Sequence, residues 1–183
     1  SYRTQQTIFF DRHTLQAMLQ QWAEEHPLLV SFNGEQFDFP LFRALLRRHA
    51  DTLAQGHAEH PEAVALRTLC DQFKALAARG YDILQEVWKV AGRGAAHGLN
   101  SLDALCQANG LGAKTGTGAS APRLWQAGRI AEVLNYCHHD ILLTRRLFEY
   151  ALDTGGILHR KDGSRVVIGL PHLPGCLPHK ETT

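Results

Sequence analysis

The feature that most constrains the fold is a short apolar segment in the first third of the chain. Residues Leu28–Phe32 are apolar except for Ser31, and Asn33-Gly34 follows directly. A strand that is apolar on both of its alternating faces is typical of a parallel or mixed sheet covered by helices on both sides. Pro27 precedes the segment, and Pro40 after it suits the first turn of a helix. We therefore predict an α/β fold with this strand buried among helices.

Periodicity and turn residues predict the other elements. Apolar residues spaced three and four apart predict five helices, at about residues 15–26, 40–50, 61–78, 101–109 and 129–152. The longest helix is expected to bury one stripe of side chains: Ile130, Leu134, Cys137, Ile141 and Phe148. Short β-rich runs predict a strand at residues 7–10 and a hairpin of residues 157–160 and 165–170 around Asp162-Gly163. Residues 51–60 are expected to form a loop, and the pattern at residues 81–90 leaves helix and strand both open.

Composition limits the possible functions. The 183 residues predict one domain, which we place at residues 1–170, followed by a tail at residues 171–183. No apolar run approaches the roughly 18 residues that cross a membrane. The formal net charge is +1, so a nucleic-acid role must rest on a local site rather than on a general basic excess. Cys106 and Cys137 occupy apolar helical positions, which predicts buried thiols in a reducing, cytoplasmic protein.

A carboxylate follows the apolar strand almost at once. Asp38 lies four residues beyond Gly34, at the start of the helix that contains Pro40. Open α/β sheets build their sites beyond the carboxyl ends of strands, which makes Asp38 a candidate site residue. An Asp at a helix start is also a common N-cap. Position alone leaves both interpretations open.

A second polar pair lies on the longest predicted helix. Tyr136 and Asp140 are four residues apart and therefore share a face of that helix. They lie beside the apolar stripe rather than opposite it. Taken alone, the pair favours a boundary tyrosine and a solvated aspartate over a functional pair.

Taken together, these two features resemble a known superfamily. Asn33-x-x-x-Phe37-Asp38 resembles the second motif of the DEDD 3′–5′ exonucleases, and Tyr136-x-x-x-Asp140 resembles the third motif in its tyrosine form. Residues 101–114 and 124–129 resemble the superfamily's linker region. The resemblance covers residues 7–170 and includes the proofreading domain of family B DNA polymerases and predicted bacterial exonuclease domains, some of them attached to helicases. It implies a ribonuclease H-like fold: a mixed sheet flanked by helices, rich in helix.

The resemblance also implies roles for individual residues. Asp38 and Asp140 would ligate metal, because two-ion phosphodiester hydrolysis needs carboxylates to hold Mg²⁺ or Mn²⁺ ions about 4 Å apart. Tyr136 would orient the attacking water. Asn33 and Phe37 would hold the motif's backbone and the terminal nucleotide, although Phe37 suits a core position equally well.

Three further positions receive expectations from the same resemblance. Lys114 and Arg129 are candidate phosphate contacts, with a solvated surface position as the alternative for both. Asp82, in Tyr81-Asp82-Ile83-Leu84, matches a recurrent position of the superfamily. We expect Asp82 to make a supporting hydrogen bond rather than to ligate metal.

The sequence departs from the superfamily at the first motif. No Asp-x-Glu follows a strand in this chain, and Asp11, in Phe9-Phe10-Asp11-Arg12-His13, is interpreted as a helix cap. The chain therefore resembles the later part of a nuclease domain, whose first strands were removed or lie on another segment, or else a degenerate domain. With two of four carboxylates, we expect a weak or inactive nuclease on its own.

The sequence therefore predicts a metal-dependent 3′–5′ exonuclease acting on the 3′ end of single-stranded DNA or RNA. An upstream segment or an associated helicase or polymerase module is its expected partner. The alternative is a non-catalytic nucleic-acid-binding or scaffolding module. Zinc is not favoured, because structural zinc takes four ligands and the two histidine-containing clusters are small: His57 with His60, and His172, Cys176 and His179.

Overall fold

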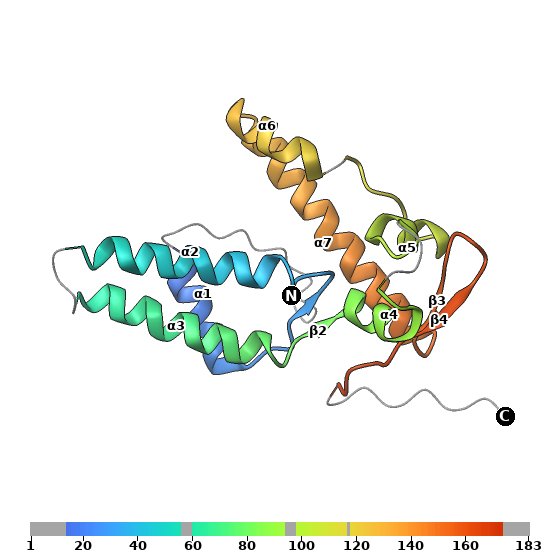
Figure 1. Ribbon diagram of the computed structural model, residues 1–183, viewed down its shortest axis with the longest axis horizontal. Helices are drawn as coiled ribbons and strands as arrows, with labels where there is room; N and C mark the ends of the chain where they lie inside the picture. The colour runs from blue at the N-terminus through green and yellow to red at the C-terminus, as the bar shows by residue number, and fades with distance from the viewer. Residues whose placement is uncertain (1–13, 56–59, 94–97, 117, 174–183) are drawn as a thin grey trace. The chain divides into compact units, whose positions relative to one another are not determined.

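The structure is a computed structural model that describes residues 14–55, 60–93, 98–116 and 118–173 (Figure 1). The chain divides into two compact units, residues 1–82 and residues 83–183. The strand expected at residues 7–10 and the cap expected at Asp11 lie outside the described residues. So do three members of the zinc hypothesis: His57, Cys176 and His179. The single domain at residues 1–170 stays a prediction.

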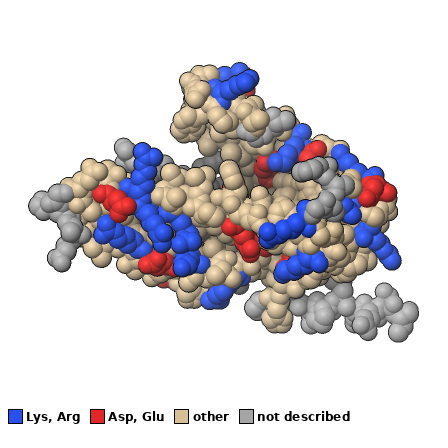
Figure 2. Space-filling view, viewed as in Figure 1, with Lys and Arg blue, Asp and Glu red and all other residues tan. Residues whose placement is uncertain are grey.

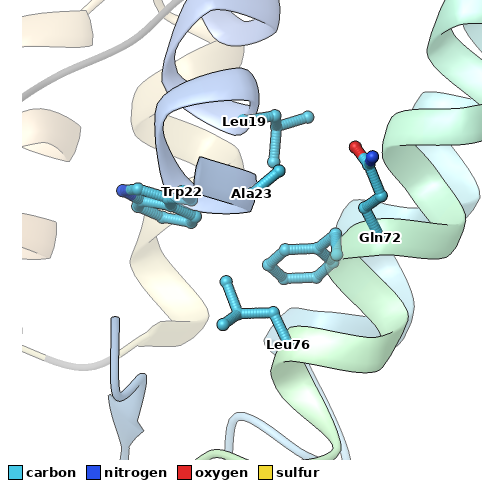
Figure 3. Close-up of a pocket in the computed structure, with 6 residues that line it drawn as sticks. Leu19, Trp22, Ala23, Gln72 and Leu76 are labelled. Carbon is cyan, nitrogen blue, oxygen red and sulfur yellow. The ribbon is translucent and has the colours of Figure 1, made fainter. Parts of the chain in front are cut away.

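Among the described residues, the first unit consists of three helices and a small parallel strand pair. It comprises α1 (Leu15–Glu25), β1 (Val30–Ser31), α2 (Asp38–Leu53), α3 (Pro61–Ala77) and β2 (Tyr81–Asp82). The strands pair in parallel, with Val30 opposite Tyr81 and Ser31 opposite Asp82. Phe73 of α3 is the centre of the core, in contact with the rings of Trp22, Phe39 and Phe42. Figure 3 shows Leu19, Trp22 and Ala23 of α1 facing Leu76 and Gln72 of α3.

The predicted helices of this unit are confirmed, with two changes at their ends. α1 ends at Glu25 because His26 turns the chain in the left-handed region, with φ of 46°. α2 continues to Leu53, so the expectation of a loop from residue 51 was wrong. Ala50 is fully buried and Leu53 packs against the same core, which stabilises the last turn of α2 despite its polar residues.

The second unit combines helices with a β-hairpin. Its elements are α4 (Ile83–Ala91), α5 (Leu102–Ala108), the 3₁₀ turn η1 (Gly118–Ser120), α6 (Ala121–Gln126), α7 (Ile130–Asp153), β3 (Ile157–His159) and β4 (Arg165–Val167). β3 and β4 pair antiparallel, as the Asp-Gly turn predicts. The sequence left helix and strand both open for residues 81–90, and the structure shows strand β2 followed by helix α4. Ser101 caps α5 by accepting a hydrogen bond from the amide of Ala104 at 3.1 Å.

The buried face of α7 differs from the predicted stripe. Of the five residues expected there only Phe148 is buried; Leu134, Cys137 and Ile141 are exposed. The core side instead carries Leu143, Leu147 and Ala151. Both sets have helical spacing, and they lie on neighbouring faces. Periodicity alone therefore could not decide between them. Cys106 is buried as expected, and burial raises the pKa of its thiol to about 12.

The described residues hold two separate two-stranded sheets amid a majority of helix. A ribonuclease H-like mixed sheet is thus not confirmed, while the helix-rich character is. None of the described helices has the length and apolar character needed to traverse a bilayer. On the face shown in Figure 2, basic side chains cover more of the surface than acidic ones, and acidic side chains lie beside them.

Candidate functional site

The turn between β1 and α2 is tightly built. Asn33 has φ of 67°, in the left-handed region that Asn tolerates better than most residues. A Cβ on Gly34 would stand 2.5 Å from Cβ of Ser31, so no side chain fits there. The Phe37 amide donates to the Asn33 carbonyl at 3.1 Å, and the Phe39 amide donates to the Gly34 carbonyl at 2.8 Å. The Asn-Gly dipeptide therefore fixes where α2 begins.

Asp38 is the first residue of α2, and Phe37 occupies the N-cap position. The alternative interpretation of Asp38 as the N-cap of this helix was therefore wrong. Partial burial raises the pKa of Asp38, and the nearby carboxylate of Asp82 adds to this against the lowering effect of its own backbone amide. A carboxylate kept next to another carboxylate is a natural ligand for a cation, because the cation relieves their repulsion.

Asp82 supports this turn from the neighbouring strand. Its side chain is buried, at 3% exposure. One oxygen accepts from the Asn33 amide at 3.0 Å, and the other accepts from the Ser31 hydroxyl at 2.9 Å and the Glu35 amide at 3.1 Å. The supporting hydrogen bond expected from the sequence is confirmed, and there are three of them.

The two remaining residues of the second motif differ in their exposure to solvent. Phe37 is 62% exposed, so the alternative of a core position for Phe37 was wrong. Asn33 is half-buried, and its Oδ1 is shielded from solvent with no hydrogen-bond donor among the described residues. Phe37 therefore presents an aromatic face to solvent one residue before Asp38, which is the arrangement that base stacking needs.

In the second unit, Tyr136 and Asp140 share one face of α7 and meet Lys114. The ammonium of Lys114 lies 2.6 Å from Oδ2 of Asp140 and 3.4 Å from the hydroxyl of Tyr136. It also lies 5.6 Å from the centre of the tyrosine ring, within cation–π range. Oδ1 of Asp140 is buried, and none of the described residues donates to it. Oδ2 of Asp140 is thus paired with Lys114, and Oδ1 has no hydrogen-bond donor among the described residues.

The loop that carries Lys114 is fastened along α7. Arg146 donates to the Leu111 carbonyl at 3.3 Å, and the ring of His139 donates to the Ala113 carbonyl at 2.9 Å. The Lys114 amide donates to Asp103 at 2.7 Å, and this bond lowers the pKa of Asp103. Sequence reasoning assigned none of these contacts, because 26 residues separate Lys114 from Asp140 and no periodic pattern links them.

The charges of this cluster reinforce one another. Burial acts to lower the pKa of Lys114, but its hydrogen bond to Asp140 and the charge of Asp140 outweigh burial, and the pKa is raised. Burial raises the pKa of Tyr136 as well, against the opposing charge of Lys114. At neutral pH the lysine is therefore an ammonium and the tyrosine a neutral phenol.

Arg129 lies apart from these contacts. It is exposed at the N-cap of α7, and its guanidinium pairs with Glu132 one turn further on, at 2.7 Å through Nη2. The structure thus gives Arg129 a local ion pair, and its role as a phosphate contact stays a prediction.

The fit of these residues to a divalent cation is partial. Hard cations prefer carboxylate oxygens, and Oδ1 of Asp140 and the carboxylate of Asp38 are such donors. Across the described ranges no three side chains of His, Cys, Asp or Glu gather as a metal site. Asp38 belongs to the first unit and Asp140 to the second, so their joint ligation of metal stays a prediction.

Comparison with known proteins gives one match. Residues 4–162 match the model of a family described as predicted 3′–5′ exonucleases related to the exonuclease domain of PolB. Neither a curated protein nor a solved structure matches the chain. The matched range contains Asp38, Tyr136 and Asp140, and it confirms the resemblance stated from those motifs.

Proposed function

Since the chain belongs to the family of predicted 3′–5′ exonucleases related to the exonuclease domain of PolB, we propose that it acts on the 3′ end of single-stranded DNA or RNA. The reaction is metal-dependent hydrolysis of the terminal phosphodiester bond. The observation that carries this proposal concerns Oδ1 of Asp140, which is buried and has no hydrogen-bond donor among the described residues. Asp140 lies one helical turn from Tyr136 on α7. A ligand and a water-positioning phenol then lie on one helix face.

The metal-binding residues of the proposal are Asp38 and Asp140. Mg²⁺ or Mn²⁺ held by carboxylates would stabilise charge on the attacking and leaving oxygens. Asp38 is suited to this because its carboxylate has the negative charge of Asp82 beside it and gains from a cation. Asp140 is suited to it through Oδ1, while Oδ2 keeps its bond to Lys114.

Tyr136 is proposed to position water. A tyrosine is an uncharged phenol at neutral pH, and burial raises the pKa of Tyr136 further, so it holds a water molecule by hydrogen bonds rather than by taking its proton. Lys114 keeps the hydroxyl in place from one side at 3.4 Å. Its ammonium also supplies a positive charge that favours an approaching phosphate.

Phe37 and Asn33 are proposed to hold the terminal nucleotide. The exposed ring of Phe37 offers a stacking surface beside Asp38. Stacking is tolerant of sequence, which suits an enzyme that removes nucleotides in succession. We further propose that the chain works in the cytoplasm together with an upstream segment or an associated helicase or polymerase module that completes the metal site.

A second candidate function is a nucleic-acid-binding or scaffolding module without catalysis. The ion pair between Lys114 and Asp140 favours it, because the ammonium already neutralises the carboxylate that would hold metal. In that case Lys114 substitutes permanently for a cation. The two candidates differ in whether bound strands become shorter.

The experiment that tests the proposal uses single-stranded DNA and RNA labelled at either end, with the protein in excess and Mg²⁺ or Mn²⁺ present. An exonuclease of this polarity shortens the 5′-labelled strand stepwise and releases the 3′ label as a mononucleotide at once. We expect slow digestion that a chelator and Asp140→Asn both abolish. Asp162→Asn removes an equal charge from the hairpin turn and serves as the matched control.

Two outcomes contradict the proposal. Equal digestion by the wild type and Asp140→Asn would show that the nuclease activity belongs to a contaminant. Binding of the labelled strands without shortening, at any concentration of Mn²⁺ and with the upstream segment or module that completes the metal site present, would favour the non-catalytic module.

A further inference from the structure

The buried carboxylate of Asp82 contacts one turn of the chain, and these contacts indicate its role. Its buried carboxylate belongs to β2, yet it contacts the turn that follows β1. The strand pair is only two residues long, and Ser31 opposite Asp82 is its last register position. The parallel backbone pairing ends at Ser31. Beyond it, the side chain of Asp82 holds the turn by accepting hydrogen bonds from the amides of Asn33 and Glu35.

The backbone amides in this turn need an acceptor. Asn33 is in the left-handed region and its amide points to Asp82, as does the amide of Glu35 two residues later. Buried amides without acceptors are costly, by about 1–3 kcal/mol each. A carboxylate is suited to this position because it only accepts, with about four lone-pair sites. Three of those sites are occupied by the turn.

The same occupancy argues against direct metal ligation by Asp82. A ligand to a cation must direct a lone pair at it, and most of those of Asp82 are directed at Ser31, Asn33 and Glu35. Asp38 begins its helix three residues after Glu35 and is more exposed. The two aspartates therefore have different roles: Asp82 is buried and holds the turn, whereas Asp38 is exposed to solvent.

We propose that Asp82 is the positioning residue for Asp38, fixing the Ser31–Glu35 turn so that the carboxylate of Asp38 is held ready for a divalent cation. This inference rests on the proposed function. It adds a residue whose contribution reaches the metal only through the turn.

The test combines Asp82→Asn with Asp38→Asn and measures Mn²⁺ binding by calorimetry. In Asp82→Asn the introduced amide keeps the volume of the side chain but turns one acceptor into a donor, which opposes the Glu35 amide. We expect Asp82→Asn to remain folded, to lose protection of the Asn33 and Glu35 amides against hydrogen exchange, and to bind Mn²⁺ about 10-fold more weakly or worse, as is typical for loss of an outer-shell partner. Asp162→Asn is the matched control and leaves all three unchanged.

The double variant separates the possible roles. If Asp82 acts through Asp38, the pair Asp38→Asn with Asp82→Asn binds Mn²⁺ no more weakly than Asp38→Asn alone. Additive losses would make Asp82 an independent ligand and overturn the inference. So would unchanged Mn²⁺ affinity in Asp82→Asn when the wild type binds Mn²⁺. A wild type that neither binds Mn²⁺ nor digests nucleic acid, even with the segment or module that completes the metal site present, would instead overturn the proposed function.

A second variant keeps the test decisive if Asp82→Asn fails to fold. Ser31→Ala removes one of the three donors and leaves both backbone bonds to Asp82. We expect a smaller loss in the same direction, roughly two- to threefold in Mn²⁺ affinity, with faster exchange of the Glu35 amide. No change in either quantity would overturn the inference.

Discussion

The two units of the chain each carry one of the proposed metal-binding carboxylates, and the two carboxylates have opposite electrostatic surroundings. Asp38 in the first unit has another carboxylate near it, and its pKa is raised, chiefly by burial. Asp140 in the second unit pairs with an ammonium at 2.6 Å. One carboxylate gains from any cation that arrives, and the other already has one.

The difference follows from how each is held. Asp38 stands on a turn fixed by a buried anion, Asp82, so the support itself repels its charge. Asp140 stands in the middle of a helix and is approached by a loop that α7 fastens through His139 and Arg146. In the first unit, the ionised carboxylate of Asp38 lowers the stability of the fold. In the second unit, the ion pair with Lys114 stabilises Asp140 without metal. Substitutions in the two units should therefore change stability in opposite directions.

The largest effect is expected from Asp140→Asn. The amide loses the charge that binds a cation, and it leaves Lys114 without its ion-pair partner. Removing a metal ligand forfeits several kcal/mol of charge stabilisation in the transition state, so digestion should fall by at least about 100-fold. Single-turnover rates and Mn²⁺ calorimetry on the same preparation measure this, and the two should fall together. A variant that binds Mn²⁺ like the wild type would remove Asp140 from the ligand set.

Tyr136→Phe should separate rate from affinity. The hydroxyl is proposed to position water and not to ligate metal, and such positioning acts mainly in the transition state. We expect the rate to fall about 10- to 100-fold, with Mn²⁺ affinity within about twofold of the wild type. If Tyr136→Phe weakened Mn²⁺ binding as much as Asp140→Asn, the role assigned to Tyr136 would be wrong.

The sequence predicted those parts of the candidate site whose contacts join residues close together along the chain. The Asn33-Gly34 turn, the placement of Tyr136 beside Asp140 and the hairpin around Asp162-Gly163 all follow from local spacing. The Asp82 hydrogen bond was predicted from the resemblance alone. Local spacing could not predict it, because a parallel neighbouring strand brings Asp82 to a turn that is 49 residues away from it in the sequence.

Tertiary contacts account for what was missed. Lys114 reaches Asp140 only because His139 and Asp103 fasten its loop, and nothing in the spacing of these residues encodes that. The buried face of α7 was also misassigned, because two apolar stripes compete and packing against neighbouring elements selects one.

Lys114→Met should have a moderate effect on stability in the second unit. Methionine keeps the packing of the aliphatic stem but leaves Asp140 without its cation and Tyr136 without its cation–π partner. With both side chains about a quarter exposed, we expect a loss of about 1 kcal/mol in the free energy of unfolding. Thermal melting in a chelator measures this, and a melting temperature equal to that of the wild type would mean that the ion pair contributes nothing to stability.

The same variant tests whether the charge of Lys114 weakens metal binding. Mn²⁺ should raise the melting temperature of Lys114→Met by more than it raises that of the wild type, because the ammonium on Oδ2 no longer offsets the negative charge that attracts a cation to Oδ1. Equal shifts would mean that the charge of Lys114 does not weaken cation binding at Asp140.

The smallest effect, and the one of opposite sign, is expected from Asp38→Asn. The raised pKa means that the folded chain binds the Asp38 proton more tightly than the unfolded chain does. Ionisation of Asp38 therefore lowers stability as pH rises through the ordinary range of an aspartate and up to the raised pKa. Above that range Asp38→Asn should be more stable than the wild type by up to about 0.5 kcal/mol, a small value because solvent reaches the carboxyl. At lower pH, where Asp38 is protonated, the two should melt together. Urea unfolding at a series of pH values measures the difference, and a wild type more stable than Asp38→Asn at neutral pH without metal would mean that Asp38 has a cationic partner and that the two carboxylates have similar electrostatic surroundings.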